Sequence, residues 1–308
     1  MLFKRRADGP GLSVVAVFHN MRREARRTLH SLSATYQALP AGAAYEVLVI
    51  DNGSGTPLRE ENVRSFGPEF RHLRLDSASP SPCAAINTWI GAARFENVIV
   101  LIDGARILSP GILQLMSTAL RAFPHPFVYT LGMHIGHKPQ NYLVAEGWNQ
   151  DSEDRLLAEV DWQRNGYALF TVSSVALSSR QGFFSPLSES NCFCARRDDL
   201  LRIGMYNTGF TSPGGGLCNL DIFNRFNDAD WIQPVLLLGE ATFHQFHGGV
   251  ATNVPMDRHP WDAMAEEYLH VVGKPYENRF RPPVYLGTVR PECRSLYLAP
   301  PPDGAAVG

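Results

Sequence analysis

The chain has 308 residues, of which 44% are hydrophobic and 19% are charged, and its formal net charge is -2. This composition is typical of one large folded domain or two small ones, and the near-neutral charge argues against bulk binding of nucleic acid, which needs a basic face. The five cysteines form no CxxC pair, and the sequence shows neither a membrane-length apolar run nor a signal-peptide pattern, so we expect a cytoplasmic protein without a membrane span.

Strands and helices are predicted to alternate through the first 125 residues. Short β-branched apolar runs predict strands at 12–18, 45–50, 72–76 and 97–103. Apolar residues at helical spacing predict helices at 22–39 and 84–95, and a proline-initiated helix follows from 109 to 123. This alternation predicts a doubly wound parallel sheet, whose ligands lie beyond the carboxyl ends of the strands.

The alternation ends after residue 125. We expect strands at 127–136 and 167–178, helices at 153–163 and 195–206, and a glycine-rich loop that leads into a helix. The segment 233–249 predicts a strand followed by a histidine-bearing loop. A loop and an amphipathic helix are expected within 253–276, where they offer a lid or a homo-oligomer contact. Basic residues at 4–6 and 22–27 predict a solvated helix face, with an anionic surface or a phosphate as the alternative partner.

Polar clusters stand at three of the predicted strand ends. An aspartate that ends a buried strand either presents its carboxylate at the lip of the sheet or caps a turn. Because three such clusters should meet at one edge, the pattern favours a ligand site. The clusters are Phe18-His19-Asn20, Asp51-Asn52-Gly53-Ser54 and Asp103-Gly104-Ala105.

The order of these motifs resembles a family 2-type glycosyltransferase of the GT-A fold, over roughly residues 12–250. The segments that carry the resemblance are "LSVVAVFHNMRREARRTLHSL", "YEVLVIDNGSG", "AAINTWIGAARFENVIVLIDGARILSPG" and, less closely, "ESNCFCARRDDLLRIGMYNTGFTSPGGGLCNLD". The resemblance implies an α/β fold with a Rossmann-like, mainly parallel sheet flanked by helices and a mixed acceptor-side half. We divide the chain into an N-terminal extension (1–11), a nucleotide-sugar-binding half (12–125), an acceptor-binding and catalytic half (126–252) and a C-terminal helix and tail (253–308).

The resemblance also implies a chemistry. Such enzymes move a hexose from a nucleotide-diphospho-sugar, here GDP-mannose or a UDP-sugar, to a hydroxyl of a sugar or polysaccharide acceptor, with Mn²⁺ or Mg²⁺. The residues that it implies for donor binding are Phe18, His19 and Asn20 around the base, Asp51 and Asn52 near the base or ribose, and Asp103, Gly104 and Ala105 at the metal motif.

The metal motif departs from the family pattern, because Ala105 stands where the last acid of Asp-x-Asp belongs. A hard cation is poorly held by one carboxylate. His244 and His247 offer further ligands, as related GT-A enzymes use a C-terminal histidine. We expect one of them to bind the metal while the other contacts a phosphate or is structural; the alternative is that both are ordinary loop residues.

The catalytic motif departs as well. The family's Glu-Asp-x-Asp is replaced by Cys218, Asn219, Leu220 and Asp221, and neither cysteine nor asparagine suits a general base. Three explanations stay open: Asp221 is the base, another acid such as Glu189 or Glu240 replaces it, or the reaction retains configuration and needs no base. Asp221 could also be only a helix cap.

Two other classes of protein compete with an active glycosyltransferase. The missing acids are compatible with a non-catalytic GT-A-fold protein that binds a glycan or a partner enzyme. A nucleotidyltransferase is disfavoured, because the segment "FHNMRREARR" lacks the glycine-rich loop such an enzyme carries after its first strand.

Overall fold

The structure is a computed structural model that describes residues 11–76, 79–179 and 182–298. The basic residues 4–6, and all of the N-terminal extension except Gly11, lie outside these ranges. The first half contains β1 (Leu12–Phe18), α1 (Arg22–Ser31), β2 (Tyr45–Asn52), α2 (Glu60–Arg64), β3 (Phe70–Leu75), α3 (Cys83–Ala92), β4 (Asn97–Leu101), β5 (Arg106–Leu108) and α4 (Ile112–Ala122).

The second half mixes strands with shorter helices. Its main elements are β6 (Pro126–Ile135), α5 (Gln140–Ala145), α6 (Gln150–Ala158), β7 (Ser173–Val175), β8 (Cys192–Arg196), α7 (Arg197–Ile203), α8 (Cys218–Asp228), β9 (Gln233–His244), α9 (Trp261–Val272), β10 (Val284–Gly287) and α10 (Ser295–Leu298). Among the described residues, no helix has the length and apolarity that crossing a membrane requires.

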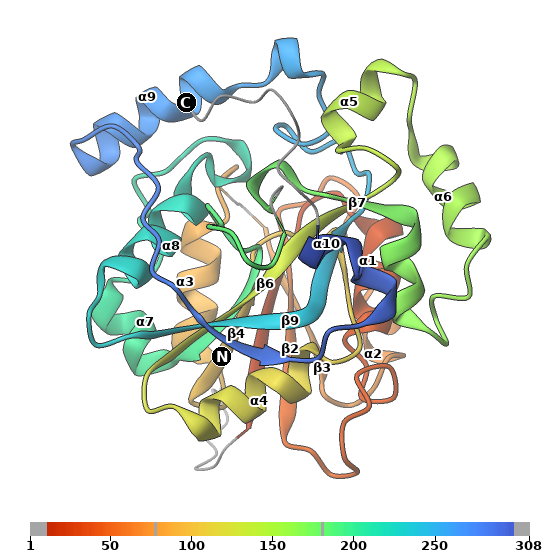
Figure 1. Cartoon of the computed structure of the whole chain (residues 1–308), viewed down its shortest axis with the longest axis horizontal. Helices are drawn as coiled ribbons and strands as arrows, with labels where there is room; N and C mark the ends of the chain where they lie inside the picture. The colour runs from red at the N-terminus through yellow and green to blue at the C-terminus, as the bar shows by residue number, and fades with distance from the viewer. Residues whose placement is uncertain (1–10, 77–78, 180–181, 299–308) are drawn as a thin grey trace.

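One central sheet organises the fold (Figure 1), with the strand order β10-β9-β6-β8-β4-β1-β2-β3. The strands β3, β2, β1 and β4 are parallel neighbours, as the alternating first half predicts. Antiparallel β8 then separates β4 from β6, and the short strands β5 and β7 pair antiparallel with β9 and β6. The predicted α/β fold, with a mainly parallel sheet and a mixed second half, is confirmed.

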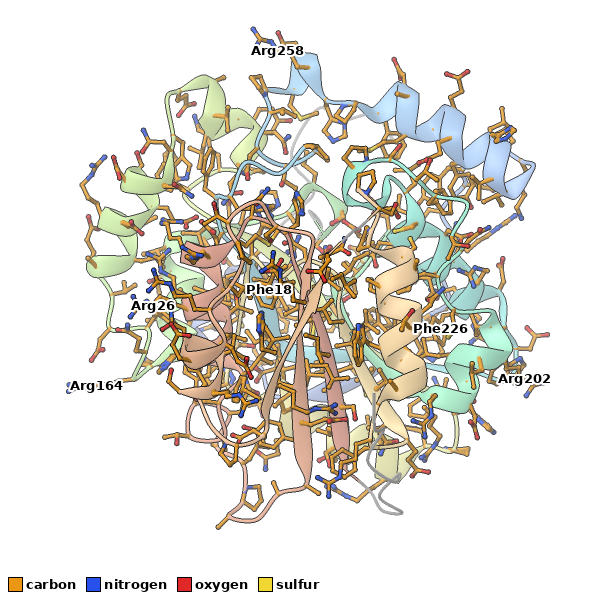
Figure 2. All side chains as sticks on the ribbon, turned by 180° about the vertical axis from the view of Figure 1, so that it is seen from behind. Phe18, Arg26, Arg164, Arg202, Phe226 and Arg258 are labelled. Atoms are coloured by element: carbon orange, nitrogen blue, oxygen red, sulfur yellow. The ribbon has the colours of Figure 1, made fainter. Side chains whose placement is uncertain are left out.

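Both faces of the sheet are covered, which explains the unbroken apolar runs in the central strands. Every residue of β1, β2 and β4 is buried, as expected for parallel strands between two helical layers. Residues of α3 and α8 pack on one face, and residues of α1 and α4 pack on the other. Phe226 and Phe18 mark these two cores, and Figure 2 shows both rings inside the molecule while Arg164, Arg202 and Arg258 lie at its periphery.

Helix α1 is shorter than its apolar spacing predicts. It ends at Ser31 rather than near residue 39. The Ser31 hydroxyl donates to the carbonyl of Thr28 and accepts the N–H of Leu108, and the Ser33 hydroxyl donates to the carbonyl of His30. Serine side chains that satisfy backbone groups in this way compete with helix continuation. A turn therefore replaces the last predicted helical residues.

The strand predicted at 167–178 is wrong for most of its length. A 3₁₀ segment, Gly166–Val172, precedes the three-residue strand β7, and a second 3₁₀ turn follows at Leu177–Ser179. Strand β6 already pairs with β8 near Val128 and Tyr129, so β7 finds a free edge only at Met133–Ile135. The limited edge of β6 explains why so little of this apolar run becomes a strand.

Candidate active site

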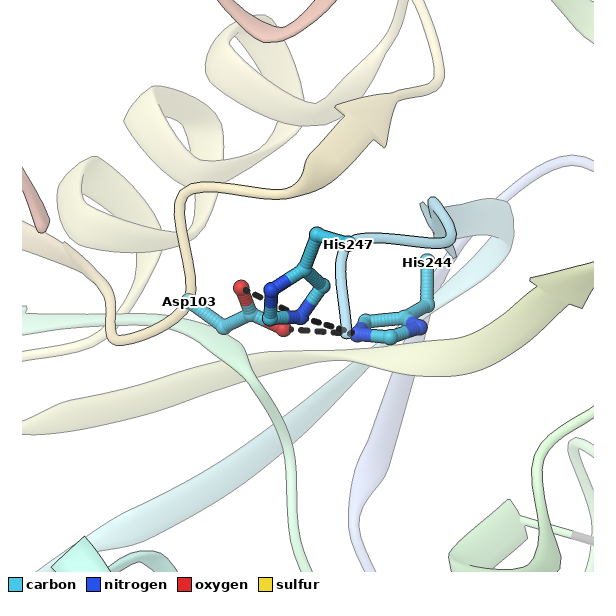
Figure 3. A group of neighbouring side chains, drawn as sticks. All are labelled: Asp103, His244 and His247. Atoms are coloured by element: carbon cyan, nitrogen blue, oxygen red, sulfur yellow. Dashed lines mark hydrogen bonds and ion pairs between the residues drawn. The ribbon is translucent and has the colours of Figure 1, made fainter. Parts of the chain in front are cut away.

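Three side chains that can ligate a metal meet at one end of the sheet. Asp103 follows β4, His244 ends β9, and His247 lies in the loop just beyond it (Figure 3). The Nε2 atom of His244 lies 3.0 Å from Oδ2 of Asp103 and 3.2 Å from Nε2 of His247. His247 Nε2 lies 3.8 Å from Oδ1 of Asp103, and the three ligand atoms all lie within 4.8 Å of one another. The structure thus brings Asp103 together with both histidines that the sequence nominated.

Strand pairing explains how residues so far apart in the sequence meet. The short strand β5 pairs with β9 so that Arg106 lies opposite His244. The loops that extend these strands are joined next to this pair, where the N–H of Gln245 donates to the carbonyl of Ala105 at 2.8 Å. The register of β5 on β9 therefore sets the distance between Asp103 and the histidines.

The His244 ring is oriented by Gln140, the first residue of α5. The Nδ1 atom of His244 lies 2.7 Å from Oε1 of Gln140, which also accepts a hydrogen bond from Asn253. Because an amide oxygen only accepts, Nδ1 of His244 is the donor and Nε2 keeps its lone pair. Burial lowers the pKa of His244 to about 4, against the opposing effect of Asp103. His244 therefore presents a neutral, fixed ligand nitrogen toward Asp103.

Asp103 completes a donor set that fits a divalent cation. Burial alone would raise the pKa of the Asp103 carboxyl, but His244, His247 and Arg106 outweigh it and hold that pKa below its usual range. Oδ1 also accepts the N–H of Ala105 at 3.0 Å, so this aspartate orders its own turn as well as facing the histidines. One carboxylate with two imidazoles suits Mn²⁺ better than Mg²⁺, which prefers oxygen ligands.

Gly104 and Ala105 shape the loop through contacts within the protein, and their role in donor binding stays a prediction. The Gly104 N–H donates to the carbonyl of Val17, and its carbonyl accepts from the Thr28 hydroxyl. A Cβ at position 104 would lie 2.3 Å from the Phe18 ring, so only glycine fits there. Ala105 is fully buried, and both of its backbone groups are hydrogen-bonded within the protein.

Phe18 belongs to the core, since its ring is fully buried, and its contact with a base stays a prediction. The two residues after it are exposed and bind the neighbouring loop. His19 Nδ1 lies 2.9 Å from the carbonyl of Asn52, and the Asn20 N–H donates to the Ser54 hydroxyl. Of the three residues implied for the base, His19 and Asn20 are placed where a ligand could reach them.

Asp51 is buried and organises the loop after β2. Its Oδ1 accepts the N–H of Ser54 at 3.0 Å, and its Oδ2 accepts the N–H of Leu58 at 2.6 Å. The adjacent Asn52 is also buried and donates to the carbonyl of Ser79. These contacts make Asp51 a turn-ordering residue in the structure, and its contact with a base or ribose stays a prediction.

Among the proposed catalytic acids, Glu189 is the half-buried one that contacts the start of α8. Its Oε2 accepts a hydrogen bond of 2.8 Å from Nδ2 of Asn219, the residue that stands in the family's catalytic motif. The Asn219 amide also donates to the carbonyl of Ser190 and accepts from the Tyr206 hydroxyl, so its orientation is determined. The structure therefore places a carboxylate beside the position where the motif lost one.

Asp221 and Glu240 have other partners. Oδ2 of Asp221 accepts from both Nε and Nη2 of Arg225, at 2.9 and 2.7 Å, and Arg225 also binds the carbonyls of Ile203 and Met205. Glu240 is fully buried and accepts from the Ser109 and Tyr167 hydroxyls. An acid engaged in this way is a poor proton acceptor for a substrate, so the geometry favours Glu189 over both.

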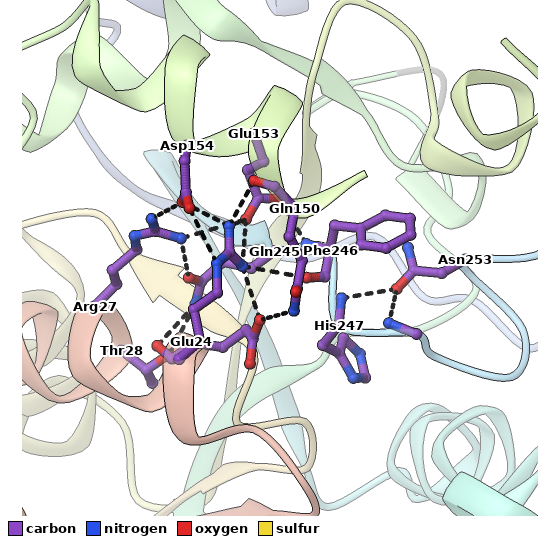
Figure 4. A network of polar contacts seen from close by, with 12 residues as sticks. Glu24, Arg27, Thr28, Gln150, Glu153, Asp154, Gln245, Phe246, His247 and Asn253 are labelled. Carbon is purple, nitrogen blue, oxygen red and sulfur yellow. Dashed lines mark hydrogen bonds and ion pairs between the residues drawn. The ribbon is translucent and has the colours of Figure 1, made fainter. Parts of the chain in front are cut away.

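A polar network holds the histidine-bearing loop against α1 and α6 (Figure 4). Glu153 accepts the N–H of Phe246 at 2.6 Å, and Arg23 and Arg27 both pair with Glu153 and Asp154. Burial raises the pKa of Glu153 to about 7, although the Phe246 N–H and the two arginines oppose that rise. These arginines therefore join two helices, which corrects the expectation of a purely solvated face.

Sequence reasoning missed three residues around the cluster: Arg106, Gln140 and Asn253. Arg106 follows the metal motif directly, so its charge next to Asp103 was a signal that could have been used. Gln140 and Asn253 lie in segments without a recognisable motif, and only the fold brings them to His244.

The fold and the comparisons agree on a class of protein. The central sheet of mostly parallel strands flanked by helices is similar to GT-A glycosyltransferase structures, and a cluster of side chains that could hold a metal ion lies at its edge. The family model described as glycosyl transferase family 2 matches residues 13–175, more than half of the chain, and the chain belongs to this family.

One solved structure supports the same fold. The crystal structure of residues 1–349 of TarS from S. aureus is similar with a TM-score of 0.51 and 13% identity, over 85% of this chain and 66% of that chain. The same fragment in complex with UDP-GlcNAc has a TM-score of 0.48 and 14% identity, over 85% and 67%. No curated protein sequence matches the chain.

Proposed function

We propose that this protein is a metal-dependent hexosyltransferase, which moves a hexose from GDP-mannose or a UDP-sugar to a sugar hydroxyl of a glycan or polysaccharide. The observation that carries the proposal is the convergence of Asp103, His244 and His247 beyond the ends of β4 and β9. Ligands of doubly wound folds bind at this edge of the sheet. Family membership supports the reaction class.

Asp103, His244 and His247 are the residues that would hold the cation. A bound Mn²⁺ or Mg²⁺ supplies positive charge that stabilises the diphosphate as it leaves. The base and ribose of the donor would lie near His19, Asn20 and the loop after Asp51 and Asn52, at the neighbouring strand ends. In this proposal the sugar would lie between the cluster and the start of α8.

Glu189 is our candidate general base. As the acceptor oxygen attacks the anomeric carbon, Glu189 takes the hydroxyl proton, the carbon–oxygen bond to the diphosphate breaks, and the nucleoside diphosphate leaves with the electron pair. The hydrogen bond from Asn219 orients the carboxylate through Oε2. A single displacement of this kind inverts the anomeric configuration.

Binding and product analysis test the proposal. Calorimetry with UDP and GDP, each with Mn²⁺, Mg²⁺ or EDTA, should give nucleotide binding that depends on the cation. A screen of nucleotide-sugars with NMR analysis of the product should then give an inverted anomer. Retained configuration would remove Glu189 from its role. Absence of any nucleotide binding would favour the non-catalytic, glycan-binding alternative.

A further inference from the structure

Arg106 is a buried cation that the proposed mechanism does not yet use. Its residue is 3% exposed, and it lies on β5 directly opposite His244 on β9. Residues paired across neighbouring strands share one face of the sheet. His134, paired with His244 from β6, lies on the same face. The Arg106 side chain therefore lies on the same face of the sheet as His134 and His244, next to the cluster of Asp103, His244 and His247.

Two of the three guanidinium nitrogens of Arg106 are buried without a hydrogen-bond partner in the part of the chain that the structure describes. Its Nε lies 3.5 Å from Asp103 Oδ2, an ion pair at a distance too long for a good hydrogen bond. Among the described residues, neither Nε nor Nη1 has a hydrogen-bond partner. Burial lowers the pKa of Arg106, and the charges of Asp103 and Glu189 only partly oppose that effect. A buried charge without hydrogen bonds is costly, and such groups usually have a partner.

The charge balance of the cluster points to an anionic partner. A metal-bound imidazole is neutral. The family motif would place a second acid at position 105, but this chain has Ala105 followed by Arg106. With a divalent cation in place, Asp103 would be the only acid of the cluster, and Arg106 adds a positive charge beside it. Such a site favours a ligand that carries more negative charge than a ligand bound at a complete Asp-x-Asp motif.

We propose that Arg106 donates hydrogen bonds to a phosphate oxygen of the donor's diphosphate and stabilises that group as it leaves. This inference rests on the proposed function, because the diphosphate belongs to the nucleotide-sugar. The planar guanidinium suits an oxyanion, and the position beside Asp103 places it next to any phosphate that shares the cation. A carboxylate on the transferred sugar has the same chemistry and is the alternative source of the oxyanion.

The test measures nucleotide affinity and ligand-free stability in the full chain. Arg106→Met removes the charge at similar volume. Arg106→Lys keeps the charge but lacks the planar guanidinium with its paired N–H donors. With Mn²⁺ present, we expect Arg106→Met to weaken binding of UDP or GDP by about 10- to 100-fold, Arg106→Lys to recover part of that loss, and the corresponding nucleoside to bind unchanged. Without ligand, Arg106→Met should unfold at the same or a higher temperature, because an unsatisfied buried charge is removed.

Arg196→Met is the matched control. Arg196 ends β8, opposite Asn97 at the far end of β4 from Asp103, and its guanidinium donates to the carbonyls of Leu120 and Pro124. This variant should unfold at a lower temperature and bind the nucleotide as the wild type does. Its unfolding temperature and nucleotide affinity are the reference for the loss of a purely structural arginine.

Three outcomes would overturn the inference. Wild-type nucleotide affinity in Arg106→Met makes Arg106 structural, above all if its unfolding temperature falls as in Arg196→Met. Unchanged UDP affinity with lost preference for UDP-glucuronic acid over UDP-glucose assigns Arg106 to a sugar carboxylate. If the wild-type protein binds neither UDP nor GDP, the proposed function fails together with this inference.

Discussion

Asp51 and Asp103 hold similar places in the sequence, each near the end of a buried strand and one or two residues before a glycine, but their carboxylates have different partners. Asp51 is buried and accepts N–H groups of Ser54 and Leu58 from its own loop. Asp103 faces His244 and His247, which lie more than 100 residues further along the chain. A distant segment therefore distinguishes the two strand-end aspartates, because only Asp103 meets side chains with which it could hold a metal ion.

The acids of the second half repeat this contrast. Asp221 is paired with Arg225 on its own helix, whereas Glu189 is held by Asn219 from a different segment and remains half-buried. In each pair, one acid has only local partners, and the acid that also meets a distant segment is the candidate for chemistry. Variants of these acids should therefore differ in their effects on turnover, cation binding and stability.

The largest effect is expected for Glu189→Gln. If Glu189 accepts the acceptor proton, this variant should lower kcat by about 10²- to 10⁴-fold and leave nucleotide affinity unchanged. Asp221→Asn is the matched variant, and it should lose stability through the Arg225 pair while retaining most of its turnover. Steady-state kinetics with calorimetry separate the two. Equal loss of turnover in both variants would contradict the assignment.

The next effect concerns the cation. Asp103→Asn removes the only carboxylate of the cluster and should weaken Mn²⁺ binding by at least about 100-fold. Calorimetry or the paramagnetic effect of Mn²⁺ on water relaxation measures this directly. Unchanged Mn²⁺ affinity would show that the cation binds elsewhere or not at all.

Asp51→Asn should lower the stability of the protein without changing Mn²⁺ binding, whereas Asp103→Asn should weaken Mn²⁺ binding. An asparagine can accept only one of the two N–H groups that Asp51 satisfies, and its NH₂ group faces the other donor. We expect a loss of about 1–3 kcal/mol in the free energy of unfolding, with Mn²⁺ affinity unchanged. Urea unfolding measures the loss. A stable variant with weakened nucleotide binding would instead support a direct contact between Asp51 and the donor.

The smallest effect is a pH dependence at Glu153, which holds the backbone next to His247. Because the pKa of Glu153 is raised to about 7 in the folded protein, its stabilising contribution is complete below its ordinary pKa near 4.5 and is lost as the pH rises through 7. Between pH 5 and 8 the metal-free wild type should lose about 1–3 kcal/mol relative to Glu153→Gln. The exposed Glu60 supplies the control, since Glu60→Gln should leave the wild-type slope unchanged in urea unfolding.

The alternation of apolar strands and helices was enough to predict the parallel half of the sheet and the edge where polar residues gather. That much follows from the sequence because burial on both faces requires continuous apolar strands, and because parallel strands end at one edge. The local patterns also nominated Asp103, His244, His247 and Glu189. They did not separate these residues from Asp51, Asp221 and Glu240, which share the same residue types and similar surroundings in the chain.

Tertiary structure decided the partners of those acids. Asp51 and Asp221 are held by their own loop or helix, and Glu240 is enclosed by Ser109 and Tyr167. Asp103 and Glu189 instead meet His244 and Asn219. The pairing of β5 with β9 places Arg106 and Asp103 beside His244, and Gln140 then orients the imidazole. The short length of β7 also depended on how much of the β6 edge was free. Such contacts join segments far apart in the chain, so no local spacing encodes them, and only the register of the folded sheet determines them.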